Sequence, residues 1–122
     1  MLSNIFLVGL GSFLGGSARY LINLLLSASP GRLPLATLSV NVVGCFLIGL
    51  LSAFFARNSA DSATWRLFLI VGFCGGFTTF STFINENFLL LRGGQLWIVL
   101  GYLLLSIALG FLSLYAGYRL AH

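Results

Sequence analysis

The sequence predicts an all-α integral membrane protein with four transmembrane helices, the third of them broken in mid-membrane. Of its 122 residues, 59% are hydrophobic and only 7% are charged, and these proportions do not fit a water-soluble core. The hydrophobic residues form four long stretches, and a helix that crosses a bilayer needs roughly 20 mainly apolar residues. Four crossings use nearly the whole chain, so we expect one transmembrane domain, residues 1–122, and no soluble catalytic domain.

The first two predicted spans are separated by a short turn. The first covers about residues 2–26 and is followed by a segment containing proline and glycine, which favour a turn over continued helix. The second covers residues 34–56 and begins with Pro34, a residue tolerated in the first turn of a helix. A polar connection over residues 57–62 then ends this half of the chain.

The last two predicted spans cover residues 65–91 and 95–119. Thr64 directly precedes the third span and is a plausible helix cap. A short Arg-Gly-Gly break over residues 92–94 separates the third span from the fourth. Because every connection is short, successive helices are expected to run antiparallel.

The formal net charge of +4 comes from six scattered arginines, which form no cluster of the kind that binds nucleic acid. In a four-span topology one membrane face receives Arg57, Arg66 and Arg119, and the other receives Arg32, Arg92 and Arg19. Topology normally follows an excess of basic residues on the cytoplasmic side, so this balance predicts insertion in both orientations, unless the balance is chance. Four helices scarcely enclose a conduction path, which favours a paired protein.

Small and polar residues recur along one face of three spans at spacings of three and four. The residues are Ser12, Gly15, Arg19 and Asn23; Thr37, Asn41 and Gly44; and Tyr102, Ser106, Gly110, Ser113 and Gly117. Such seams serve either helix packing or function, since polar groups are costly in lipid. The packing interpretation is weakest for Asn41 and Arg19. Arg19 must find water or a counterion, or extend to the membrane interface.

The most informative segment is the run Gly-Phe-Cys-Gly-Gly-Phe-Thr-Thr-Phe-Ser-Thr-Phe over residues 72–83. Paired glycines followed by adjacent threonines do not favour an uninterrupted helix, so we expect a break near residues 75–79 rather than a tolerated glycine kink. A break at membrane depth persists only where its backbone groups are buried in protein or face water or an ion. Carbonyl groups freed there could coordinate a cation.

Phe80 and Phe83 follow the predicted break and lie on one helix face. Phenylalanine at this spacing is usually core, but its ring edges are electropositive and could favour a small anion in a pore. Asn41, Tyr102 and Ser106 would add hydrogen-bond donors. A pore for a strongly hydrated anion must replace the lost water donors and still allow the ion to leave.

At these residues the sequence resembles the Fluc (CrcB) family of fluoride channels. The matching pieces are Gly15-Gly16-Ser17-Ala18-Arg19-Tyr20, Thr37-Leu38-Ser39-Val40-Asn41-Val42-Val43-Gly44, and the run from Gly72 to Phe83. The similarity covers essentially the full chain. Two positions depart from the pattern: Ala36 stands where a glycine is common, and Gly110 where a serine can occur.

The resemblance implies an antiparallel, dual-topology homodimer in the inner membrane, with two fluoride pores and a structural sodium ion at its centre. Such a protein lets fluoride leave the cell passively and protects it from fluoride toxicity. The resemblance further implies roles for individual residues. Asn41, Phe80, Phe83, Tyr102 and Ser106 would line the pore; Arg19, Thr37, Ser81, Thr82 and Glu86 would form a vestibule and polar track; and the carbonyls of Gly75 and Thr78 would bind sodium.

Two other functions are compatible with four short helices. A small dual-topology proton-coupled multidrug exporter needs an acidic residue in its first span, where this chain has Arg19 and no carboxylate; its only intramembrane acid is Glu86. A non-transporting assembly subunit would be held to another membrane protein by its small-residue seams. An enzyme is not expected, since the only histidine is His122 and the two acids lie far apart.

Overall fold

The computed structural model describes residues 1–27, 32–58 and 62–122. Within them four helical segments are long and apolar enough to cross a membrane: α1 (Leu2–Leu25), α2 (Leu35–Arg57), a segmented third span over Ser62–Arg92, and α6 (Leu96–Ala121). The four-helix membrane fold predicted from the sequence is therefore confirmed, and the chain is a multi-pass membrane protein. The predicted connections near residues 27–32 and 57–62 lie partly outside the described residues.

Helix ends fall within a few residues of the predicted bounds, and the largest difference is at the start of the third span. Its first helix, α3 (Ser62–Arg66), begins three residues before the expected Trp65. Thr64 lies inside this helix, so the prediction that it caps the third span is wrong. Polar residues are acceptable in the first turn of a helix, which explains why the polar stretch does not mark its boundary.

The third span consists of four segments, with the break at Thr78, just beyond the helical residues Gly75–Phe77. After α3 the chain forms a π-helix, η1 (Leu67–Cys74), then a short α4 (Gly75–Phe77) and, beyond the break, α5 (Ser81–Arg92). Thr78 has an extended backbone (φ −85°, ψ 159°), so the helix ends here. The predicted break is confirmed, although Gly75 is itself helical. The π-helix, which is often found at functional sites, was not anticipated.

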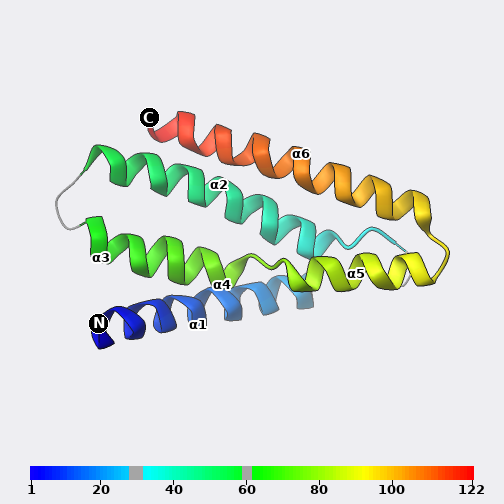
Figure 1. Cartoon of the computed structure of the whole chain (residues 1–122), viewed down its shortest axis with the longest axis horizontal. Coiled ribbons are helices and arrows are strands. Elements are labelled where there is room, and N and C mark those ends of the chain that lie inside the picture. The colour runs from blue at the N-terminus through cyan, green and yellow to red at the C-terminus, as the bar shows by residue number, and fades with distance from the viewer. Residues whose placement is uncertain (28–31, 59–61) are drawn as a thin grey trace.

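The spans pack as two helix pairs (Figure 1). α1 runs along the first half of the third span, α2 runs along α6, and both termini lie at the same end of the molecule. Glycines bring each pair into close contact: a Cβ added to Gly15 would overlap the Phe73 carbonyl oxygen, and one added to Gly117 would overlap that of Phe46. The two pairs contact each other much less: α1 and η1 make few contacts with α2.

A small hydrophobic core joins the second half of the third span to α2 and α6. It consists of Leu38, Phe83, Leu90, Val99 and Tyr102, all at most 9% exposed. By contrast, large apolar side chains such as Phe6, Phe111 and Leu112 are well exposed along the helices. A soluble protein would bury such side chains, whereas lipid is their natural solvent. This core fixes α5 beside the break.

Candidate functional site

The break in the third span forms one wall of a hollow of about 330 Å³. The other walls come from α2, α5 and α6. The lining residues are Asn41, Cys45, Ile48, Thr78, Thr79, Phe80, Phe83, Ser106 and Ile107. We call this space the break hollow. It brings together four of the five residues expected in a pore, Asn41, Phe80, Phe83 and Ser106, from three separate spans.

Asn41 on α2 pairs with the backbone of Thr79 in both directions. Its Nδ2 donates to the Thr79 carbonyl (3.1 Å), and its Oδ1 accepts from the Thr79 amide (2.8 Å). The break removes these two backbone groups from helical hydrogen bonding, and unsatisfied groups are costly in a membrane. A single asparagine therefore satisfies both groups and holds the break against α2.

Several hydrogen-bond donors remain available beside the hollow. The Ser106 hydroxyl is buried and has no hydrogen-bond partner in the part of the chain that the structure describes. Asn41 uses one of its two Nδ2 hydrogens. The Thr79 hydroxyl accepts from the Thr82 amide (3.3 Å), and no acceptor is recorded for its own hydrogen within the described part of the chain. Donors of this kind replace the water that a small anion loses on leaving solution.

The two phenylalanines occupy the hollow differently. Phe80 belongs to the break itself and is 74% exposed, whereas Phe83 on α5 is only 9% exposed. Their ring centroids are 6.3 Å apart and the rings are tilted by 45°. Phe80 thus extends outward from the chain, and Phe83 forms part of the inner wall. Their electropositive edges suit a partly dehydrated anion without adding a full charge.

Glu86 is held away from the break hollow by two hydroxyl groups. Its Oε2 accepts from the Thr37 hydroxyl (2.7 Å) and its Oε1 from the Tyr102 hydroxyl (2.8 Å). Tyr102 is completely buried, and its ring meets Phe83 edge-on with centroids 4.8 Å apart. Tyr102 was expected in the pore, but it is not among the residues that line the break hollow. It stands behind Phe83 and positions Glu86.

The predicted polar residues of α1 contact the first half of the third span. Arg19 Nε donates to the Gly76 carbonyl (3.1 Å), and the Ser12 hydroxyl donates to the Gly72 carbonyl (3.3 Å). Both acceptors lie in the segment formed by the π-helix and α4, where regular helical bonding is perturbed. Arg19 was expected to raise anion density at an entrance; the structure ties its guanidinium to the helix that precedes the break.

Ser81 and Thr82 were expected in the polar track, and both lie in the first turn of α5. Ser81 is exposed, and Thr82 is half-buried. The Thr82 amide donates to Thr79, which connects the start of α5 to the break. Neither side chain lines the break hollow.

Within the described residues, the backbone oxygens of the two residues expected to bind sodium accept no recorded hydrogen bond. No hydrogen bond to the Gly75 or Thr78 carbonyl is recorded, while the Gly76 and Thr79 carbonyls beside them are bonded by Arg19 and Asn41. Across the described ranges no cluster of three His, Cys, Asp or Glu side chains could hold a metal. A hard cation binds oxygen ligands, so the donors that fit it here are these carbonyls.

Sequence reasoning missed four residues of the break hollow: Thr79, Cys45, Ile48 and Ile107. Cys45 and Ile48 follow Asn41 by four and seven residues, so they lie on the same face of α2, and this spacing was visible in the sequence. Thr79 gave no separate signal, because its importance comes from its backbone pairing with a residue 38 positions away.

Comparison with known proteins gives the family directly. Residues 6–118 match the family described as CrcB-like protein, Camphor Resistance (CrcB). A relative from Chlorobium phaeobacteroides (strain DSM 266), named fluoride-specific ion channel FluC, is 53% identical over 91% of this chain and 86% of that relative. A FluC from Prosthecochloris aestuarii is 47% identical over 98% of this chain and 93% of that relative.

More distant relatives carry the same kind of name. Fluoride-specific ion channel FluC 1 of Yersinia pestis is 43% identical over 88% of this chain and 85% of that relative. These names describe ion channels, a class of transport protein and not of enzyme. With a family match over nearly the whole sequence and relatives of this identity, the chain belongs to the CrcB family.

Proposed function

We propose that the protein is a fluoride-selective channel of the bacterial inner membrane that lets fluoride leave the cell down its electrochemical gradient and so limits fluoride toxicity. The observation that carries this proposal is the break hollow. It combines two phenylalanine rings with unpaired donors from Asn41, Thr79 and Ser106, and no carboxylate lines it. The relatives named fluoride-specific channels support the choice of ion.

Fluoride flux from liposomes tests the proposal. Purified protein in fluoride-loaded vesicles should release fluoride to an external electrode, with far smaller release of chloride from matched vesicles. Phe80→Ile and Phe83→Ile should each slow the release. Phe88→Ile is the matched control, because Phe88 is exposed on α5, the helix that carries Phe83, and does not line the hollow. No fluoride release, equal chloride release, or unchanged flux in both hollow variants would reject the proposal.

The conducting unit is an antiparallel homodimer. Support comes from Phe80, which is 74% exposed in mid-span, and from the open side of the break hollow that a second copy would complete. The two weakly joined helix pairs leave further surface for a partner. Because Arg19 bonds to the Gly76 carbonyl beside the break, the faces are left with Arg32 and Arg92 against Arg57, Arg66 and Arg119, and a difference of one arginine still fits insertion in both orientations.

Labelling from both sides of the membrane tests this arrangement. Asn58→Cys, introduced with Cys45→Ala and Cys74→Ala, places one thiol at the exposed end of α2. Impermeant reagent should label about half of the protein from each side. Labelling from one side alone, or a monomer in a conducting preparation, would reject the antiparallel dimer.

A structural sodium ion is the remaining part of the proposal. The Gly75 and Thr78 carbonyls have no hydrogen-bond donor in the described structure, and Gly75 is exposed in mid-span where a partner would lie. A cation there would neutralise the carbonyl dipoles that the break leaves unpaired. Replacing sodium with N-methyl-D-glucamine should lower the melting temperature of the dimer; an unchanged melting temperature would reject the site.

The multidrug-exporter alternative is not favoured. Its required acid would have to be Glu86, and this carboxylate accepts two hydrogen bonds from buried hydroxyl groups behind the pore-lining phenylalanine. The relatives' names give no support to drug export.

A further inference from the structure

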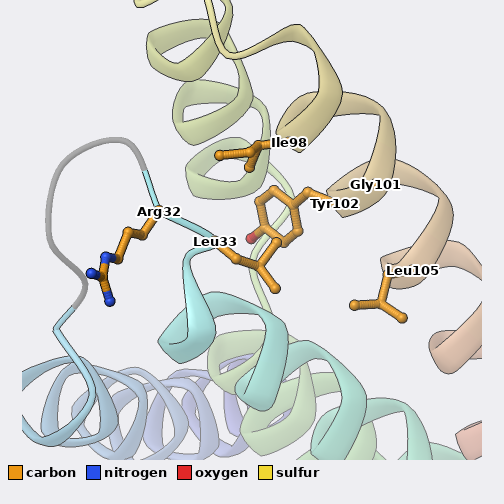
Figure 2. Close-up of a pocket in the computed structure, with 6 residues that line it drawn as sticks. All are labelled: Arg32, Leu33, Ile98, Gly101, Tyr102 and Leu105. Carbon is orange, nitrogen blue, oxygen red and sulfur yellow. The ribbon is translucent and has the colours of Figure 1, made fainter.

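A second, larger hollow of about 530 Å³ lies at the start of α2 and along the first half of α6 (Figure 2). It is lined by Arg32, Leu33, Ile98, Gly101, Tyr102 and Leu105. We call it the apolar groove. It is open at the protein surface, and the proposed conduction path does not use it.

The chemistry of this groove is opposite to that of the break hollow. Besides Arg32, its lining consists of aliphatic side chains, a glycine and one aromatic ring. The Tyr102 hydroxyl is directed to Glu86, which accepts its hydrogen at 2.8 Å. An ordered water or ion needs two to four polar partners, and the groove does not offer them. Hydrocarbon is the occupant that this lining favours.

The shape and depth of the groove follow from α6. Ile98, Gly101 and Leu105 are spaced by three and four residues, so they form one stripe about 10 Å long parallel to the helix axis. Gly101 leaves the floor of the stripe open, since an added Cβ there would meet nothing within 4 Å. Because α6 crosses the membrane, the groove extends along the direction in which lipid chains lie.

A single cation stands at the rim of the groove. α2 has 23 residues and is about 35 Å long, enough to cross the roughly 30 Å hydrocarbon core. Arg32, three residues before α2 begins, therefore lies at the membrane–water boundary. Its side chain is exposed and extends away from the aliphatic wall (Figure 2). Among the described residues, no hydrogen bond or ion pair is recorded for it.

A second copy of the chain is a poorer occupant. The copy that covers Phe80 and the break hollow would approach the face of α6 that carries Ile107. At 100° per residue, Ile107 is about 200° around the helix from Leu105. The apolar groove thus faces the opposite side, where membrane lipid is the available neighbour.

We propose that the apolar groove binds an anionic phospholipid, with one acyl chain against Ile98, Gly101 and Leu105 and the phosphate beside Arg32. An anionic lipid gains about fivefold in affinity from one arginine near the membrane surface. The acyl chain supplies the remaining affinity, because it replaces loosely packed lipid at a preformed apolar surface.

Native mass spectrometry of the purified protein tests this site. Phosphatidylglycerol should be retained in preference to phosphatidylcholine. Arg32→Gln should remove about fivefold of that preference, and Gly101→Leu, which fills the open floor, should reduce retention of both lipids. Arg92→Gln and Gly9→Leu are the matched controls: Arg92 is exposed at the end of α5, and an added Cβ on Gly9 also meets nothing within 4 Å. Both should bind as wild type.

Competition separates a lipid from a free phosphate group. Lysophosphatidylglycerol should displace the retained lipid, whereas glycerophosphoglycerol, which has the same headgroup and no chain, should not. Displacement by the chain-free headgroup would overturn the proposal, as would unchanged retention in either groove variant. A shift from dimer to monomer in Gly101→Leu would instead assign the groove to the partner copy and equally overturn it. Arg32 makes no hydrogen bond or ion pair with another described residue, so its variant remains informative even if Gly101→Leu does not fold.

Discussion

The third span is held in two different ways on the two sides of its break. Before the break, η1 and α4 lie against α1 with glycine facing backbone, as at Gly15, which leaves no space for even one added carbon. After the break, α5 is held by side chains: Glu86 bonds to α2 and α6, and Phe83 packs on Tyr102. The first half is therefore a fixed support, held by backbone contacts. The second half is tunable, because side chains both hold it in place and line the break hollow, as Phe83 does.

The same comparison resolves an ambiguity in the sequence. Small and polar residues formed similar seams on three spans, and spacing alone does not separate packing from function. In the structure, Gly15 and Gly117 prove to be close-packing positions, because an added Cβ at either would overlap backbone. Asn41 and Thr37 on α2 instead bond across to the break and to α5.

The largest effect is expected at the fixed support. Gly15→Val would place a side chain against the Phe73 carbonyl and within 2.9 Å of the Phe77 amide nitrogen. Because backbone cannot move aside as a side chain does, the cost should reach about 3 kcal/mol of unfolding free energy, the upper part of the usual overpacking range. The yield and thermal stability of the detergent-purified protein measure it. Gly16→Ala is the control, since its Cβ meets nothing within 4 Å.

A smaller loss is expected for Glu86→Ala on the other side of the break. The variant removes the shared acceptor of two buried hydroxyl groups, those of Thr37 at 1% and Tyr102 at 0% exposure. These two hydroxyl groups are close enough to bond to each other, so one donor is left unsatisfied. An unsatisfied buried donor costs about 1–3 kcal/mol. Glu86→Gln should be milder, because its amide can accept from one hydroxyl and donate to the other. Equal melting temperatures for the two variants would show that these hydrogen bonds do not hold α5.

Asn41→Asp separates conduction from support. The carboxylate still accepts from the Thr79 amide but no longer donates to the Thr79 carbonyl, and it adds negative charge at the break hollow. A like charge near the path should slow fluoride release by about tenfold, which corresponds to about 1.4 kcal/mol of electrostatic repulsion. Liposome flux at low and high ionic strength measures this. A rate equal to wild type at low ionic strength would place the ion path elsewhere.

The sequence predicted the features that depend on local composition. Apolar length predicted the four spans, and the Gly-Gly and Thr-Thr pairs predicted the break. Helical spacing predicted that Phe80 and Phe83 share one helix face, which is wrong, because Phe80 lies in the break and is 74% exposed whereas Phe83 lies on α5 and is 9% exposed. The correct predictions concern local features, since each depends on a few neighbouring residues.

Features that depend on contacts between distant residues were not predictable. The π-helix lies where α1 packs through Gly11, and a Cβ there would overlap the Phe68 carbonyl. The bond from Arg19 to Gly76 joins residues 57 positions apart. Tyr102 shares a helix face with Ser106, yet only Ser106 lines the break hollow, because the Phe83 ring lies against Tyr102. Spacing indicates the face of a helix, and packing decides which of its residues reach the site.

The smallest effect is expected at Thr79, where the fixed and tunable halves meet. Its hydroxyl accepts from the Thr82 amide at 3.3 Å, so it caps the start of α5 from within the break. Thr79→Val keeps the shape and loses this acceptor, at about 1 kcal/mol, as for other helix caps. Thr79→Ser should restore stability because it keeps the hydroxyl. Since Asn41 binds only the Thr79 backbone, Thr79→Val should leave the break in place and lower the melting temperature by a few degrees. A loss as large as that of Gly15→Val would mean that the break depends on this side chain, and that the third span is supported as rigidly after the break as before it.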